Sequence, residues 1–353
     1  MNRRGFLASG VGLAGGLAAL DARAQSGPTP FGQTGVPLPN GALPLGPLAS
    51  HYPEPRVQVL DKRFPGVPSN ALIERVASGL RWAEGPAYFP ASRQLLFSDV
   101  ANNRIMRLLE DDNHLSVFRQ PSMNANGNTV DREGRLITCE HAGRRVTRTE
   151  HNGGITVLAD RADGKRLNSP NDVAVAPDGS IWFSDPTYGL DGNYEAPKGV
   201  KEQASNNVYR IDPKTGQAVK VADGFDQPNG LTFSPDGRTL YVVDSDAHDN
   251  VRAFETDLEH GKLGKSRVFL DKLGPGNSDG LRCDTAGNIW CSYGWGDPKE
   301  DGVRCYAPDG TLLAKISLPE VCANLTFGGA LRNRLYICAS TSVYALYVNA
   351  QGA

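Results

Sequence analysis

The stretch Asn229–Asp244, NGLTFSPDGRTLYVVD, decides the fold of this 353-residue chain. It opens with an oxygen-bearing side chain and a glycine. It then continues as a short apolar run, a Pro-Asp-Gly turn and a second apolar run. Alternating apolar runs on either side of an Asp-Gly turn are typical of an antiparallel β-hairpin. We therefore expect two neighbouring strands here, with the oxygen-bearing residue just before the first.

The same phrase occurs six times in the chain, with starting points 42 to 58 residues apart. The copies begin at Glu84, Asn126, Asn171, Asn229, Asp279 and Asn324. A strand-rich repeat of about 40 to 50 residues has the length of one four-stranded propeller blade. The repeat predicts an all-β, six-bladed β-propeller.

The first residue of each copy is Asp, Glu or Asn in all six cases. In a single copy, such a residue before glycine would be read as a turn starter. Six such residues at the same position of a blade-length repeat argue against that reading, because equivalent positions of a radial array converge on its axis. The sequence therefore predicts one central cation site.

The ligands expected for this site are hard oxygen donors: Glu84, Asp279 and the amide oxygens of Asn171 and Asn229. No His or Cys occupies an equivalent position, which is unlike a zinc or copper centre. Oxygen donors of this kind favour Ca²⁺. Mn²⁺, Mg²⁺ and Zn²⁺ stay open as alternatives.

One face of the predicted disc carries the polar residues. The oxygen donors precede the first strand of each blade, so the residues that follow the second strand lie on the same face. These residues are polar or aromatic: Asp99, Asn102, Glu140, His141, Asp185, Thr187, Tyr188, Asp244, Ser245, Asp246, Tyr293 and Trp295. We expect this face to be functional and the face with the Asp-Gly turns to be scaffold.

The N-terminal part is not expected to belong to the propeller proper. Residues 1–24 combine Asn2-Arg-Arg-Gly-Phe-Leu7, a 15-residue weakly apolar run and Ala22-Arg-Ala24, the pattern of a twin-arginine export signal. The apolar run is shorter than the ~20 residues that span a bilayer, so no stable membrane insertion is expected. We expect recognition by the twin-arginine export machinery of a bacterium and a periplasmic location.

Residues 25–70 are rich in proline and should form an extended segment on the surface. The propeller should occupy residues 71–350. The run 71–76 is expected to supply the missing fourth strand of the last blade, which closes the ring and covers its sheet edges.

Composition narrows the function further. The chain carries 37 basic and 39 acidic side chains and shows no basic stripe, which argues against nucleic-acid binding. Six cysteines could form disulfides in an oxidising compartment, or stay as buried thiols, and their spacing leaves the pairing open.

Over residues 70–348 the chain resembles the gluconolactonase branch of the senescence-marker-protein/gluconolactonase/luciferin-regenerating-enzyme (regucalcin-like) family. The motifs that carry the resemblance are Trp82-Ala-Glu-Gly-Pro86, Asn126-Gly127, Cys139-Glu-His141, Asn168-Ser-Pro-Asn-Asp172, Trp182-Phe-Ser-Asp-Pro186, Gln227-Pro-Asn-Gly230 and Ser278-Asp-Gly-Leu281. One departure is Asn128, where the family motif has an apolar residue. We expect Asn128 to bond locally or to tilt its strand.

The resemblance implies a metal-dependent lactonase that hydrolyses a sugar lactone to the aldonic acid. It points to Glu84, Asn229 and Asp279 as metal ligands, and to Asn171 as a further ligand or a substrate-binding residue. Asp279 is the expected catalytic base, with Asp185 and Asp244 as rivals.

The other residues expected to bind substrate are Asn126, His141, Asp185 and Tyr188. Tyr293 and Trp295 could pack against a sugar ring. Two other functions stay open. One is a related propeller hydrolase of other lactones, aryl esters or phosphotriesters. The other is a non-catalytic binding propeller with a structural ion.

Overall fold

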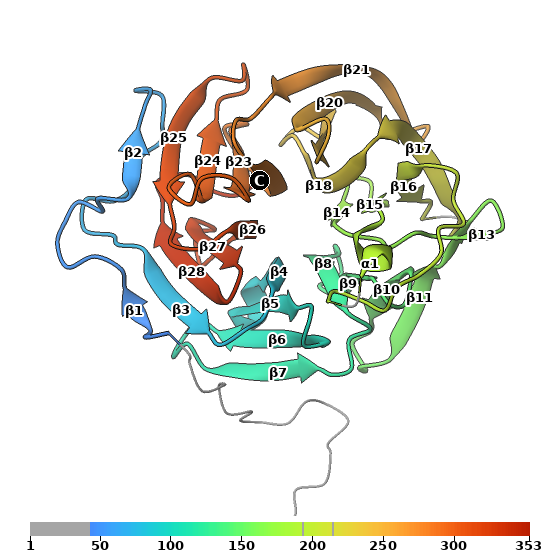
Figure 1. Ribbon diagram of the computed structural model, residues 1–353, viewed down its shortest axis with the longest axis horizontal. Helices are drawn as coiled ribbons and strands as arrows, with labels where there is room; N and C mark the ends of the chain where they lie inside the picture. Colours follow the sequence, from blue (N-terminus) through green and yellow to red (C-terminus); the bar gives the residue numbers. More distant parts are fainter. Residues whose placement is uncertain (1–42, 193, 214) are drawn as a thin grey trace, which may run out of the picture.

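The computed structural model describes residues 43–353 except 193 and 214. The expected export signal at 1–24 and the first part of the proline-rich segment lie outside the described residues. Six antiparallel sheets stand around one axis, as Figure 1 shows. The chain is thus an all-β, six-bladed β-propeller, as the repeat predicted.

Each blade contains four consecutive strands, ordered from the axis outward, except that the last blade takes one strand from the N-terminal part. The strands of blades 1 to 3 are β4 (Ala83–Phe89), β5 (Gln94–Asp99), β6 (Arg104–Leu109), β7 (Leu115–Arg119), β8 (Ala125–Val130), β9 (Leu136–Glu140), β10 (Arg145–Thr149), β11 (Ile155–Ala159), β14 (Val173–Val175), β15 (Ile181–Asp185), β16 (Asn206–Ile211) and β17 (Ala218–Phe225).

Blades 4 to 6 follow in the same order. Their strands are β18 (Gln227–Phe233), β19 (Thr239–Ser245), β20 (Asn250–Asp257), β21 (Lys262–Asp271), β22 (Asn277–Cys283), β23 (Ile289–Gly294), β24 (Gly302–Tyr306), β25 (Leu312–Ser317), β26 (Cys322–Gly328), β27 (Arg334–Ala339) and β28 (Ser342–Tyr347). A small hairpin, β12 (Arg161–Ala162) with β13 (Lys165–Arg166), lies between blades 2 and 3 in the chain.

The N-terminal part of the described chain pairs with the last two blades. Strand β3 (Glu74–Ser78) runs antiparallel to β28 and is the fourth strand of blade 6. Two short strands of the proline-rich segment, β1 (Gly46–Pro47) and β2 (Val57–Val59), lie outside β3 and β25. The first and last parts of the described chain therefore share one sheet.

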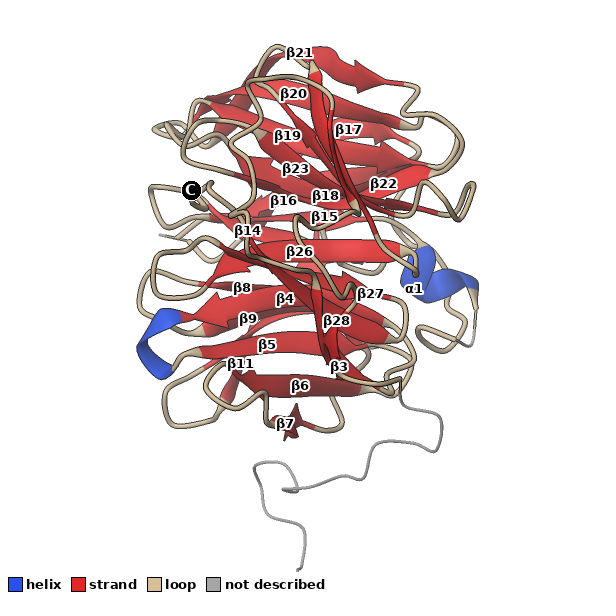
Figure 2. Ribbon diagram, turned by 90° about the vertical axis from the view of Figure 1, so that its left-hand side faces the viewer, coloured by secondary structure: helices blue, strands red, loops and turns tan. Residues whose placement is uncertain are grey.

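The two faces of the disc differ in their loops. Hairpin turns such as Asp131–Gly134 and Asp284–Gly287 join the first two strands of a blade, with glycine donating its N–H back to the aspartate carbonyl at 3.0 and 2.9 Å. Figure 2 shows the single described α-helix, α1 (Tyr188–Asp191), on the opposite side from the C-terminus. We call the α1 side the site face and the other side the turn face.

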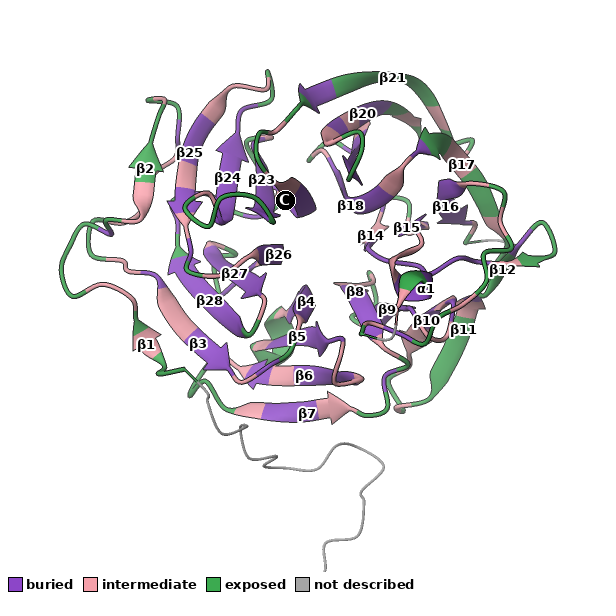
Figure 3. Ribbon diagram, in the orientation of Figure 1, coloured by how far each residue is buried: buried purple, intermediate pink, exposed green. Residues whose placement is uncertain are grey.

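The apolar core lies between neighbouring blades. Figure 3 shows buried inner strands and more exposed outer strands such as β11, β17 and β21. All six cysteines are free and buried, and burial raises their thiol pKa values where a shift is resolved, for example Cys283 and Cys291 to about 12. Within the described residues, no helix is long and apolar enough to cross a membrane.

Candidate metal centre

Five of the six repeat-initial residues meet at the axis on the site face. They stand at the start of the inner strands β4, β8, β18 and β22, or just before β14, and all five are buried: Glu84, Asn126, Asn171, Asn229 and Asp279. We call these five residues the axial ring. The sequence-based expectation that they converge is confirmed by their contacts.

The three amides of the axial ring are joined in sequence across blades 2, 3 and 4. Asn126 Nδ2 donates a hydrogen bond to Asn171 Oδ1, and Asn171 Nδ2 donates to Asn229 Oδ1 at 2.5 Å. Asn229 in turn hydrogen-bonds the carboxylate of Asp279. Asn126 Oδ1 is buried and has no partner among the described residues. The ring therefore holds an unused acceptor at its centre.

The two carboxylates of the ring are buried close to each other. Burial raises the pKa of Glu84 to about 8, and the negative charge of Asp172 adds to the effect. Burial also raises the pKa of Asp279 well above its usual range, followed by repulsion from Glu84 and Glu195. The ion pairs found among the described residues involve neither Glu84 nor Asp279. Two buried acids without a cationic partner are costly unless a cation or protons neutralise them.

Backbone bulges aim the ring residues at the axis. The register between the first two strands shifts at Glu84/Ala87, Ala125/Asn128, Pro228/Leu231 and Ser278/Leu281. A bulge bends its strand and re-aims a side chain, and it recurs here at the ring positions of four blades. Gly85 follows Glu84 with φ of +51°, and a Cβ there would meet Asn126 O at 2.1 Å. Only glycine allows blades 1 and 2 to approach this closely.

The sixth copy is one residue out of register with the others, which corrects the sequence alignment. Leu325 pairs with Ile337 just as Leu231 pairs with Val242 in blade 4, so Ala323 occupies the ring position. Asn324 takes the place that glycine holds at Gly230. Its Nδ2 still donates to Glu84 Oε2 at 3.1 Å. Asn324 thus orients a ring carboxylate from the next position.

Asn128, the departure from the family motif, bonds locally. Its Nδ2 donates to Gly85 O at 2.9 Å and to Asn126 O at 3.0 Å, and its Oδ1 accepts from Thr138 Oγ1 at 2.8 Å. It replaces apolar packing with a satisfied polar link between blades 1 and 2. Asn126 keeps its place in the axial ring.

His141 lies against the amide side of the ring. Its Nε2 is 3.2 Å from Asn126 Nδ2 and 3.1 Å from Asn171 Oδ1, and the His141 side chain is fully buried. On the other edge, Nδ1 is 3.3 Å from Glu195 Oε2. Glu195 comes from the loop after α1, and sequence reasoning missed it because it lies outside every repeat. The Glu195 carboxylate therefore lies next to Nδ1 of His141, on the edge of the imidazole away from Asn126 and Asn171.

Tyr188 opens α1 and also reaches the ring. Its hydroxyl is within hydrogen-bonding reach of Ser245 and Asn229. Burial, followed by the charges of Asp246 and Asp279, raises the pKa of Tyr188. The phenol therefore stays protonated and can donate a hydrogen bond at the site. Its expected position beside the site agrees with these contacts.

Asp185 makes its contacts within its own blade and not with the axial ring. Its Oδ2 accepts a hydrogen bond from Asn168 N at 2.8 Å, and burial raises its pKa to about 7. Asp99 and Asp244 do the same in blades 1 and 4, each accepting from two backbone amides of the loop that enters the inner strand. This repeated position ties the loop to the blade, which gives Asp185 a structural reason to be present.

Two tryptophans form an aromatic pair beside the ring. Trp82 precedes Glu84 by two residues, and its ring centroid is 5.8 Å from that of Trp295, which is 48% exposed. Tyr293, in contrast, is buried against Arg304, and its hydroxyl donates to Leu273 O at 3.1 Å. Of Tyr293 and Trp295, only Trp295 is exposed.

The donor set fits a hard divalent cation. Two carboxylates balance a charge of +2, and the amide oxygens add the neutral oxygen ligands that Ca²⁺ accepts. Among the described residues, no three His, Cys, Asp or Glu side chains form a metal-binding group. That finding is in keeping with a ring of two acids and three amides. The two uncompensated acids are the feature that a cation would satisfy.

Known proteins share both sequence and fold with the chain. A family model described as the SMP-30/Gluconolactonase/LRE-like region matches residues 82–341. A gluconolactonase from Zymomonas mobilis is 33% identical, and the match covers 77% of this chain and 80% of that protein.

Solved structures agree with this result. A gluconolactonase from Xanthomonas campestris superposes with a TM-score of 0.78 at 34% identity, covering 87% of this chain and 98% of the other. A calcium-binding protein, regucalcin, from Agrobacterium tumefaciens reaches a TM-score of 0.65 at 21% identity, covering 79% and 93%. The second likeness shows the shared propeller fold.

Proposed function

The chain belongs to the SMP-30/gluconolactonase/LRE-like family, and from that premise we propose that it is a sugar lactone lactonase that works with one divalent cation. The reaction opens the lactone with water and yields the aldonic acid. The observation that carries the proposal is the axial ring, in which Glu84 and Asp279 are buried without a cationic partner.

Glu84, Asn171, Asn229 and Asp279 would hold the cation, and Ca²⁺ suits this donor set best. A bound divalent cation supplies Lewis-acid polarisation of the lactone carbonyl and charge stabilisation for the oxyanion. The likeness to a calcium-binding regucalcin supports a divalent cation. Mn²⁺, Mg²⁺ and Zn²⁺ are tested beside it below.

The protein side chains divide the remaining work. Asp279 accepts the proton of the attacking water as its oxygen bonds to the lactone carbonyl carbon. The C–O bond of the lactone then breaks, and the leaving oxygen takes the proton that Asp279 received and becomes a hydroxyl. Asn126 offers its free Oδ1 to a substrate hydroxyl, and His141 and Tyr188 lie where they can hold the sugar. Glu195 keeps the His141 ring oriented through Nδ1.

The proposal is tested by pH-stat hydrolysis of glucono-1,5-lactone, with protein stripped by chelator, desalted and re-supplied with Ca²⁺, Mn²⁺, Mg²⁺ or Zn²⁺. We expect activity to disappear on stripping and to return with a hard divalent ion. An aryl ester and a phosphotriester are assayed in parallel. Turnover of either without turnover of any sugar lactone would move the chain to the related hydrolases, and no turnover at all would favour a binding propeller.

We also propose that the protein is exported to the periplasm by the twin-arginine pathway. The support is the Arg3-Arg4 pair, the short apolar run and the small residues at Ala22 and Ala24. Cell fractionation tests this proposal. Replacement of both arginines by lysine should leave the protein in the cytoplasm, whereas unchanged export would contradict it.

A further inference from the structure

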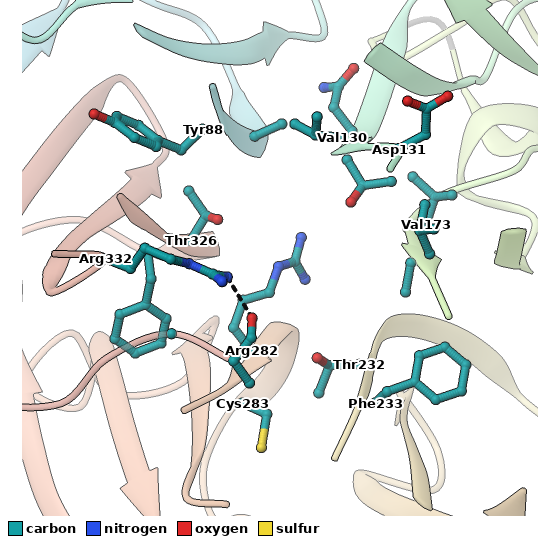
Figure 4. A pocket seen from close by; sticks show the side chains of 18 of the residues that line it. Tyr88, Val130, Asp131, Val173, Thr232, Phe233, Arg282, Cys283, Thr326 and Arg332 are labelled. Carbon is teal, nitrogen blue, oxygen red and sulfur yellow. Dashed lines mark hydrogen bonds between the residues drawn. The ribbon is translucent and has the colours of Figure 1, made fainter. Parts of the chain in front are cut away.

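The axis has a second chamber on the turn face, beyond the axial ring. Three residues after each ring position, the inner strands place a row of six residues that line this chamber: Ala87, Thr129, Ala174, Thr232, Arg282 and Thr326. The chamber has a volume of about 700 Å³ and is also lined by the C-terminal residue Ala353. Figure 4 shows it from close by. We call this space the turn-face chamber.

Arg282 is the one charged member of the row. Its side chain is 16% exposed, and in Figure 4 it reaches toward the middle of the chamber. Nη1 donates to Leu281 O at 2.7 Å and to Asp172 Oδ2 at 3.2 Å. No partner within the described chain is found for its Nε and Nη2. Half of the guanidinium fork is therefore free to bind a ligand in the chamber.

Three hydroxyls from alternate blades complete the row. Thr129, Thr232 and Thr326 belong to β8, β18 and β26, and none of the three hydroxyls has a hydrogen-bond partner in the described part of the chain. The threonine and arginine side chains can all donate hydrogen bonds inward, whereas the two alanines leave space. The lining thus offers one guanidinium, ion-paired on one side with Asp172, and three hydroxyls around one cavity.

The other charges of the lining do not cancel Arg282. Asp131 is held by Arg135, whose Nε lies 2.7 Å from Asp131 Oδ2. Arg332 donates to Ala353 O at 2.5 Å, and the exposed Arg132 stands at the same rim, with Nη2 3.4 Å from Ala176 O. The acids of the axial ring lie on the far side of Arg282, where Asp172 already takes one of its donors. On the side of the axial ring Asp172 offsets part of the Arg282 charge, whereas the Nε and Nη2 donors of Arg282 have no partner within the described chain.

We propose that the turn-face chamber binds a small oxyanion, a carboxylate or a phosphate, through Arg282 and the threonine hydroxyls. A planar guanidinium with two free donor positions matches two oxygens of such a group. This site is separate from the lactone site and stands whether or not the chain hydrolyses lactones. Two sources share the chemistry: the aldonate that a lactonase releases, and free phosphate.

The test is isothermal titration of the full chain, stripped of metal and desalted, with sodium gluconate in one arm and inorganic phosphate in the other. Without a bound cation the axial ring has no positive charge that could hold an anion, so it does not compete. We expect saturable binding of one anion per chain. Tighter binding of gluconate would identify the product class, and tighter binding of phosphate would identify the free ion.

Variants tie the binding to the chamber. Arg282→Gln should weaken it at least tenfold and Thr232→Val about threefold. Arg238→Gln, which removes a turn-face charge from a side chain that is 87% exposed, should leave the affinity within twofold of the wild type. Absence of saturable binding in the wild type, or equal affinity in Arg282→Gln, would overturn the proposal. If Arg282→Gln does not fold, unchanged affinity in a folded Thr232→Val, Thr326→Val double variant overturns it.

Discussion

Asn171 Nδ2 donates a hydrogen bond to Asn229 Oδ1 at 2.5 Å, although 58 residues separate the two side chains. Each stands at the axis end of its own blade, and neither has an apolar packing role there. The bond fixes the direction of both amides, so that the Asn229 side chain can also reach Asp279. The propeller thus pre-orients its oxygen donors before a ligand arrives, which lowers the cost of binding one.

Replacing Asp185 by asparagine tests whether this residue is structural. Burial raises its pKa to about 7 from 3.8, so the folded chain binds this proton more tightly than the unfolded chain does. The stability that the group contributes is present below about pH 4 and is lost as pH rises through 7. The difference in unfolding free energy, wild type minus Asp185→Asn, should fall by about 2 kcal/mol between pH 5 and 8.

Urea unfolding at both pH values measures this difference, with the exposed Asp160→Asn as control. The kcat/KM of Asp185→Asn should stay within about threefold of the wild type, because its contacts are with Asn168 and Ser169 and not with the axial ring. A loss of kcat/KM of a hundredfold or more in a stable variant would restore Asp185 to the substrate site.

Glu195→Gln should weaken cation binding. The charge of Glu195 raises the pKa of both Glu84 and Asp279, so the three carboxylates share one electrostatic environment. Removing one negative charge at this range should cost about 1 kcal/mol, or roughly fivefold in Ca²⁺ affinity. Calorimetric titration with Ca²⁺ measures it, and Glu259→Gln, an exposed change on blade 4, is the matched control. Equal affinity in wild type and Glu195→Gln would remove Glu195 from the site.

Trp295→Ala should raise KM for the lactone about five- to tenfold and leave kcat nearly unchanged. The reason is that the Trp295 indole packs on Trp82, two residues before Glu84, and is not placed at the reacting atoms. Trp295→Phe keeps an aromatic face and should recover most of the loss. Initial rates at saturating Ca²⁺ give both constants. Leu331→Ala removes an exposed apolar side chain on the turn face and serves as control. A fall in kcat alone would contradict a substrate-packing role.

The repeat was sufficient to predict the blade number and five of its six expected axial residues. Strand periodicity and Asp-Gly turns can be recognised locally in the sequence. Because the blades are arranged radially, the residues at one repeat position then lie together at the axis. The sixth copy misled because Asn324 looks like a ring residue in sequence, whereas strand register places Ala323 there. A one-residue offset is visible only once the partner strand is known.

Residues outside the repeat positions could not be found from sequence. Glu195 reaches His141 from a loop of no fixed pattern, and Arg282 points down the axis from a position that other blades fill with alanine or threonine. Asp185 stays a prediction as a substrate-binding residue. Its place after the second strand suggested function, and Asp99 and Asp244 show that a carboxylate at this place also caps the backbone.

The most direct test of the account is calorimetric titration of stripped protein with Ca²⁺, in wild type, Glu84→Gln, Asp279→Asn and the control Asp271→Asn. We predict one site per chain, an affinity that falls about a hundredfold or more in the two ring variants, and no change in Asp271→Asn. Circular dichroism shows whether each variant is folded. Failure of the folded wild type to bind a divalent cation, or undiminished binding in Asp279→Asn, would contradict the axial ring as a metal centre.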